Sequence, residues 1–144
     1  MTRPAAKPAK PAAPAAPPLG SKDRSVQGHI ARKPESLRPI YREVLALVQQ
    51  VAPDATVDRR FGVLVCHVQF EPLCTIKTDI RKKLVYLVLD QDGIYPDPEE
   101  LLLEHGWIGR CYLELRPEVE LPRSTILGCF RADVKRIRRR RARR

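Results

Sequence analysis

The chain has 144 residues, and 27 Lys and Arg against 17 Asp and Glu give it a formal net charge of +10 at pH 7. The longest strongly apolar run, from Leu84 to Leu89, is far too short to span a membrane, and no apolar signal core follows the N-terminus. These features argue against a membrane-spanning or secreted protein, so we expect a cytoplasmic location.

The positive charge is concentrated at the two ends of the sequence. Residues 1–33 contain seven Lys and Arg with one acidic residue, residues 34–130 contain eleven with fifteen, and residues 131–144 contain nine with one. A polyanion would therefore be attracted by the ends of the chain and, on average, repelled by the middle.

Residues 1–33 are built mainly from Ala, Pro and Lys, with Leu19, Val26 and Ile30 as their only large aliphatic residues. Burying this small apolar surface would not offset the conformational entropy lost on ordering. The segment is therefore predicted to be a disordered arm. The remainder predicts a single domain over residues 34–137, followed by an Arg-rich tail at residues 138–144.

The first ordered element is predicted to be an amphipathic helix. Apolar residues recur at 37, 40, 41, 44, 45, 48 and 51, with Ser36 as the expected N-cap and Pro53 as the stop.

Five strands are then expected, because segments rich in Val, Ile, Leu, Thr and Cys alternate with breaks such as Gly62 and Glu71-Pro72. Their ranges are residues 56–60, 63–70, 73–78, 84–89 and 110–116. The connections between the first four are too short for parallel crossovers, which indicates an antiparallel sheet. The unbroken apolar run at 84–89 predicts a central strand that is covered on both faces.

Two further helices are expected after the fourth strand. Asp97 and Glu100 resemble a capping box and predict a short helix from Pro98 to His105. From Ser124 the apolar positions 126, 127, 130, 134 and 137 return to helical spacing. The fold class is therefore α+β, with an antiparallel sheet of four or five strands that is packed by N- and C-terminal helices and carries disordered basic tails.

The strongest functional signal is the C-terminal basic cluster, because guanidinium groups pair with phosphate oxygens in a bidentate manner. The candidate nucleic-acid-binding residues are Lys135, Arg136, Arg138, Arg139, Arg140, Arg141, Arg143 and Arg144, with Arg131 at the start of the cluster. Two alternatives stay open. The cluster is a solubilising tail, or it folds back on the acidic middle of the chain.

A secondary anion patch is formed by Lys77, Arg81, Lys82 and Lys83 around a predicted turn between strands. Arg59 and Arg60 would add to it if the two segments converge at one edge of the sheet. The alternative is an ordinary solvent-exposed turn. The turn contains no aromatic residue on which bases could stack.

No pattern in the sequence indicates a catalytic, cofactor or metal site. Cys66, Cys74, Cys111 and Cys129 lack paired spacing and are expected to be small buried thiols, with a disulfide or zinc site as the alternative. Phosphate-loop, dinucleotide and hydrolase motifs are all missing, so we expect no enzymatic activity and no cofactor. The alternative is a catalytic Cys/His pair assembled in space, for instance His105 with Cys111 or Cys66.

The segment from about Leu37 to Ile137 resembles the small uncharacterised bacterial domains of the DUF5655 and DUF1801 (YdhG-like) type. The resemblance lies in the opening helix SLRPIYREVLALVQQVAPDA, the strand pair VLVCHVQFEPLCTIKT and the basic turn and strand RKKLVYLVL. It implies a compact α+β domain of unknown activity that is sometimes attached to nuclease-like or DNA-associated modules. It implies no catalytic residues.

Two functional hypotheses follow. In the first, the protein is an accessory nucleic-acid-binding protein whose basic tails contact the phosphates of DNA or RNA without sequence specificity. In the second, it is an interaction domain for a protein or a small anion, and the tails provide solubility alone. A membrane partner is not expected, and the sequence does not define the oligomeric state.

Overall fold

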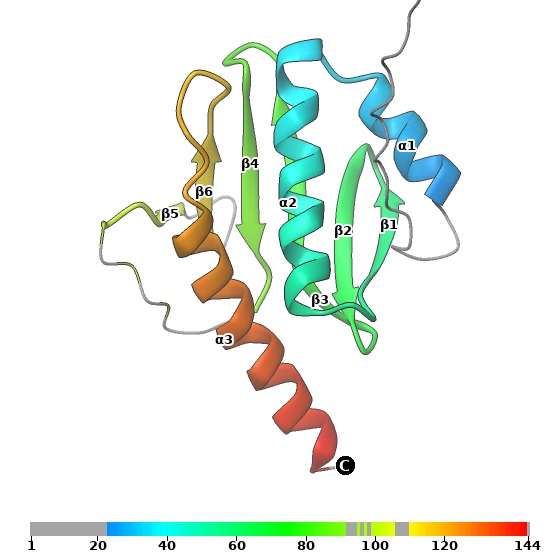
Figure 1. The fold of residues 1–144 in the computed structure, drawn as a ribbon, viewed down its shortest axis with the longest axis vertical. Coiled ribbons are helices and arrows are strands. Elements are labelled where there is room, and N and C mark those ends of the chain that lie inside the picture. The colour runs from blue at the N-terminus through cyan, green and yellow to red at the C-terminus, as the bar shows by residue number, and fades with distance from the viewer. Residues whose placement is uncertain (1–22, 92–94, 96, 98, 106–109, 144) are drawn as a thin grey trace, which may run out of the picture.

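The computed structural model describes residues 23–91, 95, 97, 99–105 and 110–143, which form an α+β fold (Figure 1). In chain order the elements are α1 (Asp23–Ala31), the 3-10 turn η2 (Glu35–Leu37), α2 (Arg38–Val51), β1 (Thr56–Arg60), β2 (Val63–Val68), β3 (Glu71–Asp79), β4 (Leu84–Leu89), β5 (Leu103–His105), β6 (Arg110–Leu115) and α3 (Arg123–Ala142).

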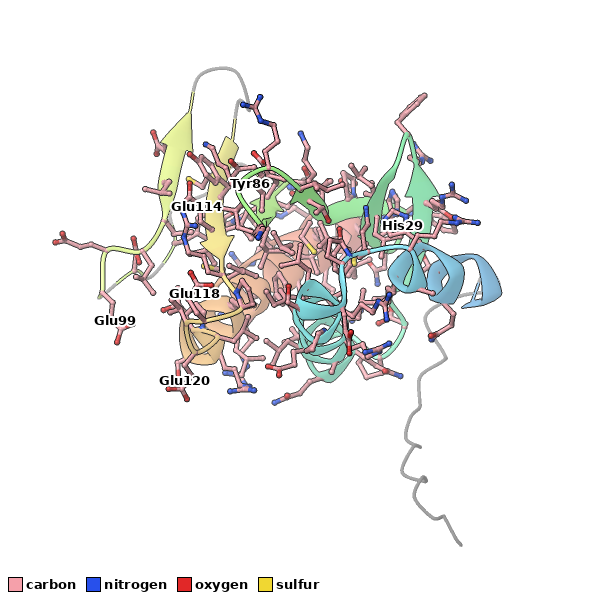
Figure 2. All side chains as sticks on the ribbon, turned by 90° about the horizontal axis from the view of Figure 1, so that it is seen from above. His29, Tyr86, Glu99, Glu114, Glu118 and Glu120 are labelled. Atoms are coloured by element: carbon pink, nitrogen blue, oxygen red, sulfur yellow. The ribbon has the colours of Figure 1, made fainter. Side chains whose placement is uncertain are left out.

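The strands form one sheet in the order β1-β2-β3-β4-β6-β5, and every neighbouring pair is antiparallel. Figures 1 and 2 show α2 and α3 lying across the same face of this sheet, with α1 beside β1. The predicted α+β class, the antiparallel sheet and its packing by N- and C-terminal helices are thus confirmed.

Strand β4 lies in the interior of the sheet, between β3 and β6, and all six of its residues are buried, as its unbroken apolar run predicted. Val85, Leu87 and Leu89 belong to the main core beneath the helices. The alternate residues of the strand join Tyr112 in a small second cluster on the other face. Burial on both faces explains why this strand shows no alternation of polar residues.

Helix α2 packs on the sheet through the apolar stripe that the sequence predicted, with Tyr41, Val44 and Val48 fully buried. The predicted N-cap at Ser36 is wrong, because Ser36 lies inside η2 and α2 begins at Arg38 without a side-chain cap. Because Pro39 lies in the first turn of α2, its missing N–H removes one of the donors that a cap would satisfy.

The arm predicted to be disordered, residues 1–33, includes a helix. Residues 23–31 form α1, and both Val26 and Ile30 are 2 % exposed because they belong to the main core. Their spacing of four residues places them on one side of the helix, so a short helix with two aliphatic residues can dock against β1. Residues 1–22 lie outside the described part of the chain.

The predicted helix from Pro98 to His105 is also wrong. The Asp97 carboxylate accepts bonds from the Leu101 and Leu102 amides, at 2.7 and 3.0 Å, four and five residues on, whereas an N-cap accepts from the amides two or three residues on. Glu100 also has φ of 56°, a left-handed conformation that an α-helix does not contain. The chain therefore turns, and Leu103–His105 forms β5, which pairs with β6 and completes the six-stranded sheet.

The hairpin between β2 and β3 turns at Gln69 and Phe70, whose φ angles are 51° and 70°, and not at Glu71-Pro72 as expected. Two consecutive left-handed residues are typical of a type I′ turn, which matches the twist of the flanking strands. Pro72 is accommodated inside β3, where the register shifts between Cys66 and His67.

Phe70 is an unfavourable residue for this turn, because its side chain is 90 % exposed and its backbone is left-handed. Replacing Gln69-Phe70 with Asn-Gly is expected to raise the free energy of unfolding by about 1 kcal/mol, since left-handed backbone costs other residues about 1–2 kcal/mol. Urea denaturation measures the change. Ile80→Gly, at an exposed turn residue without positive φ, should not stabilise the protein, and an equal gain in both variants would contradict the argument.

Candidate nucleic-acid interface

Helix α3 has two opposite faces. Ile126, Phe130, Val134 and Ile137 are buried against the sheet, as the sequence predicted, while Leu127 packs at the margin of the core. The helix continues to Ala142, so residues 138–142 of the predicted tail are its last turn and a half, and Arg144 lies outside the described residues.

The opposite face of α3 carries Arg131, Lys135, Arg139 and Arg143, which we call the α3 basic face. All four residues are exposed, and they are spaced four residues apart, so they follow one side of the helix. At a rise of about 1.5 Å per residue, the row is about 18 Å long. Within the described part of the chain, none of the four side chains forms a hydrogen bond or an ion pair. The row is therefore free to meet an external anion.

Other arginines of the predicted cluster pair with acidic residues of the chain. Arg138 donates to Asp54 at 2.9 Å, and Arg140 donates to Glu71 at 3.0 Å. Arg136 forms an ion pair with Asp133, three residues earlier on the same helix. The basic cluster is thus divided. Arg138 and Arg140 fold back on acidic residues of the rest of the chain, whereas the α3 basic face is exposed to solvent.

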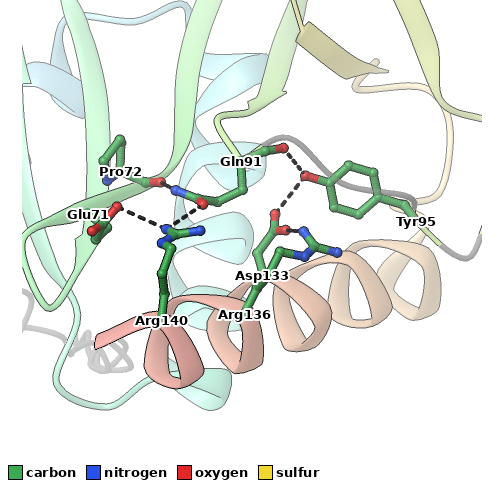
Figure 3. A network of polar contacts seen from close by, with 7 residues as sticks. All are labelled: Glu71, Pro72, Gln91, Tyr95, Asp133, Arg136 and Arg140. Carbon is green, nitrogen blue, oxygen red and sulfur yellow. Dashed lines mark hydrogen bonds and ion pairs between the residues drawn. The ribbon is translucent and has the colours of Figure 1, made fainter. Parts of the chain in front are cut away.

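Figure 3 shows that two linked groups of side chains attach α3 to the sheet. Arg140 also donates to the side-chain oxygen of Gln91 at 2.9 Å, and the Gln91 amide donates to the carbonyl of Pro72 at 2.7 Å. The Tyr95 hydroxyl lies 2.5 Å from the Gln91 carbonyl and 2.9 Å from an oxygen of Asp133. These contacts fix the position from which the α3 basic face projects.

Asp133 is fully buried, and this burial raises the pKa of its carboxyl group to about 6, although Tyr95 and Arg136 oppose the shift. Burial also raises the pKa of the Tyr95 hydroxyl, with a further contribution from Asp133. Neither Asp133 nor Tyr95 belongs to a motif that the sequence alone would mark as functional. The available signal was that Asp133 is the single acidic residue of the segment 131–144.

The secondary anion patch is divided by the structure. Arg81, Lys82 and Lys83 are exposed on the turn between β3 and β4, whereas Lys77 is half-buried within β3 opposite Tyr86. Because β1 to β4 are consecutive antiparallel strands, the β1–β2 turn lies at the same end of the sheet as the β3–β4 turn. That turn supplies an aromatic residue that the β3–β4 turn lacks, since Phe61 is fully exposed.

The cysteines are free thiols, and Cys66, Cys74 and Cys129 are buried. Cys66 and Cys74 face each other across β2 and β3, and the hydrogen bond between them, together with burial, raises the pKa of Cys74. Burial raises the pKa of Cys129 to about 12. Both shifts disfavour the thiolate, which is the nucleophilic form.

The described residues hold neither a metal-binding cluster nor a membrane-spanning helix. They contain no group of three or more His, Cys, Asp or Glu side chains placed to hold a metal ion. None of the helices in the described part of the chain has the length and apolar character needed to cross a membrane.

Comparison with protein-family models, with curated proteins and with solved structures finds no match to this chain.

Proposed function

We propose that the protein is an accessory nucleic-acid-binding protein that contacts phosphates, without sequence specificity, through the α3 basic face. The observation that carries this proposal is the row of four exposed cations with no acidic partner among the described residues. A row of about 18 Å spans about five phosphates of one DNA strand.

The composition of α3 favours binding to the phosphate backbone. The helix contains no Asn or Gln, the side chains that form bidentate contacts to adenine, and phosphate contacts position a protein without reading sequence. Its apolar side is already packed on the sheet, which leaves no apolar face for insertion into a membrane surface.

The resemblance of residues 37–137 to the DUF5655 and DUF1801 type stays a proposal and is consistent with a DNA-associated role. The alternative function is an interaction domain for a protein or a small anion, in which the α3 basic face provides solubility.

The test is a titration of duplex DNA by fluorescence anisotropy at several salt concentrations. If all four cations contact phosphates, log affinity should fall with log salt at a slope of about −4, which is a loss on the order of a hundredfold between about 50 and 200 mM salt. The triple variant Arg131→Gln/Lys135→Gln/Arg139→Gln should reduce the slope to about −1. Binding by the intact protein should be nearly independent of the DNA sequence.

A matched control removes the same charge elsewhere. The variant Arg81→Gln/Lys82→Gln/Lys83→Gln neutralises three exposed cations on the β3–β4 turn and should keep most of the slope. Equal losses in the two variants would show that net charge, and not the α3 basic face, controls binding. If the intact protein does not bind at low salt, the interaction-domain hypothesis is favoured. Substitutions are preferable to deletion of the tail, because Arg138 and Arg140 contact the core.

A further inference from the structure

A second group of basic residues lies away from α3, where the end of α1 meets β1. It consists of His29, Arg32, Lys33 and Arg59, which we call the α1–β1 cluster. His29 is in the last turn of α1 and is 4 % exposed (labelled in Figure 2). Its ring packs against that of Tyr41, with 5.8 Å between the centroids, and the Lys33 ammonium lies 5.8 Å from the same Tyr41 ring.

The charged groups that act on His29 are Lys33 and Arg32 from the end of α1 and the turn that follows, and Arg59 from β1. All of them are cations, and burial together with their repulsion lowers the pKa of His29 to about 4. Burial and Arg59 likewise lower the pKa of Lys33. Among the described residues, the charged groups that act on His29 therefore include no acid, an arrangement that opposes folding.

His29 also has an unsatisfied polar atom. Its Nε2 is buried and has no hydrogen-bond partner. Leaving a polar group buried and unpaired costs more than a typical hydrogen bond contributes, and such groups in native proteins often mark functional sites. The unpartnered nitrogen and the surrounding cations are separate observations, and an anion at this position would stabilise both.

We propose that the α1–β1 cluster is a binding site for a phosphate group. Arg32 and Arg59 are exposed and can offer guanidinium groups to phosphate oxygens, while the half-buried Lys33 supplies a fixed positive charge. His29 forms the buried wall of the site, and because its unpartnered Nε2 is enclosed by protein, the exposed Arg32 and Arg59 would make the first contact with the anion.

The neighbouring turn indicates which phosphates fit. Phe61 follows Arg59 by two residues, and its side chain is fully exposed with a left-handed backbone at φ of 49°. An aromatic residue held in solvent beside arginines is suited to stack on a nucleobase. Two ligands carry the phosphate group that this site would bind. One is free phosphate, and the other is a nucleotide unit whose base stacks on Phe61.

The test is an NMR titration of the histidine rings of the full chain, in phosphate and in chloride of equal ionic strength. Phosphate should raise the pKa of His29 by at least about one unit, because a nearby opposite charge favours the protonated form. His67, which lies on β2, should not respond. Unchanged His29 titration at saturating phosphate would overturn the proposal.

Arg59→Gln separates binding from a simple loss of charge. Without phosphate this variant should raise the pKa of His29, because one repelling cation is gone. Phosphate should then produce little further shift. The control Lys82→Gln removes an exposed cation of the β3–β4 turn and should keep the full response. A response to phosphate that persists unchanged in Arg59→Gln would contradict the assignment of the site.

Two further titrations identify the source of the phosphate. One uses a nucleoside monophosphate and the other a short single-stranded oligonucleotide. If they bind roughly tenfold more tightly than inorganic phosphate, and Phe61→Ala abolishes this gain, the ligand is a nucleotide unit. Equal affinity for all three ligands, with no effect of Phe61→Ala, would assign a free phosphate. The triple variant of α3 should keep the His29 response, so this site and the α3 basic face are tested separately.

Discussion

Arg136→Gln is expected to lower the free energy of unfolding by about 3 kcal/mol near neutral pH, because it leaves the buried Asp133 carboxylate without its cation. Arg136 is 29 % exposed and Asp133 is fully buried, so solvent screens this pair less than a surface pair. The remaining Tyr95 hydroxyl has a single proton and lies near two acceptors, the Gln91 carbonyl and Asp133. It does not replace the lost ion pair.

The loss should depend on pH in a defined direction. The pKa of Asp133 is raised from 3.8 to about 6 in the folded protein, so the stability that its protonated form contributes is present below pH 3.8 and is lost as the pH rises through 6. Arg136 lowers the pKa of Asp133, so in the variant that lacks Arg136 the pKa of Asp133 in the folded protein should be higher still. Between pH 7 and pH 5 the loss caused by the variant should therefore shrink by at most about 1.4 kcal/mol, because the Asp133 carboxyl is largely protonated in both proteins at pH 5.

Urea denaturation at pH values on either side of 6 measures both effects. Arg138→Gln is the matched control, since the Arg138–Asp54 pair lies on the same helix with side chains 40 % and 52 % exposed. Exposed pairs contribute less than about 1 kcal/mol, so this variant should lose little stability at either pH. A loss from Arg136→Gln that is the same at both pH values would show that Asp133 does not control it.

The pairing of α3 with the core was beyond sequence analysis for a physical reason. The arginines of RRRR are chemically identical, and helical spacing does not tell which of them meets an acid. Arg140 reaches Glu71, 69 residues away, and Arg138 reaches Asp54, 84 residues away. Such partners are fixed by the packing of the helix on the sheet. The sequence located the basic cluster, and the tertiary structure decided which of its members remain exposed.

The strands and α2 were predictable because a long periodic pattern determines which side chains are buried. The segment at 97–105 was not, because its local signals favour a helix start whereas Glu100 and the pairing with β6 produce a turn and a strand. The arrangement of the secondary anion patch also depends on the sheet. Its residues are adjacent in sequence, but alternation along β3 places Lys77 within the sheet and leaves the others on the turn.

Helix α1 escaped detection because its two apolar residues were averaged with a long polar arm. Ile30→Ala is expected to lower the free energy of unfolding by about 2–3 kcal/mol, near the lower end for a buried aliphatic residue because α1 is short and can detach. Gln27→Ala changes an exposed residue of the same helix and should have almost no effect.

Limited proteolysis distinguishes a docked α1 from a detached one. Trypsin cleaves after Lys and Arg, and Lys33 is followed by Pro34, so the available sites around α1 are Lys22, Arg24 and Arg32. Because Val26 and Ile30 are buried, the resistant fragment of the parent protein should begin at Asp23 or Ser25. In Ile30→Ala it should begin at Lys33, since a detached helix exposes the bond after Arg32. If the parent protein is cut at Arg32 as rapidly as this variant, α1 does not hold its place against β1, and the α1–β1 cluster loses the helix that positions His29.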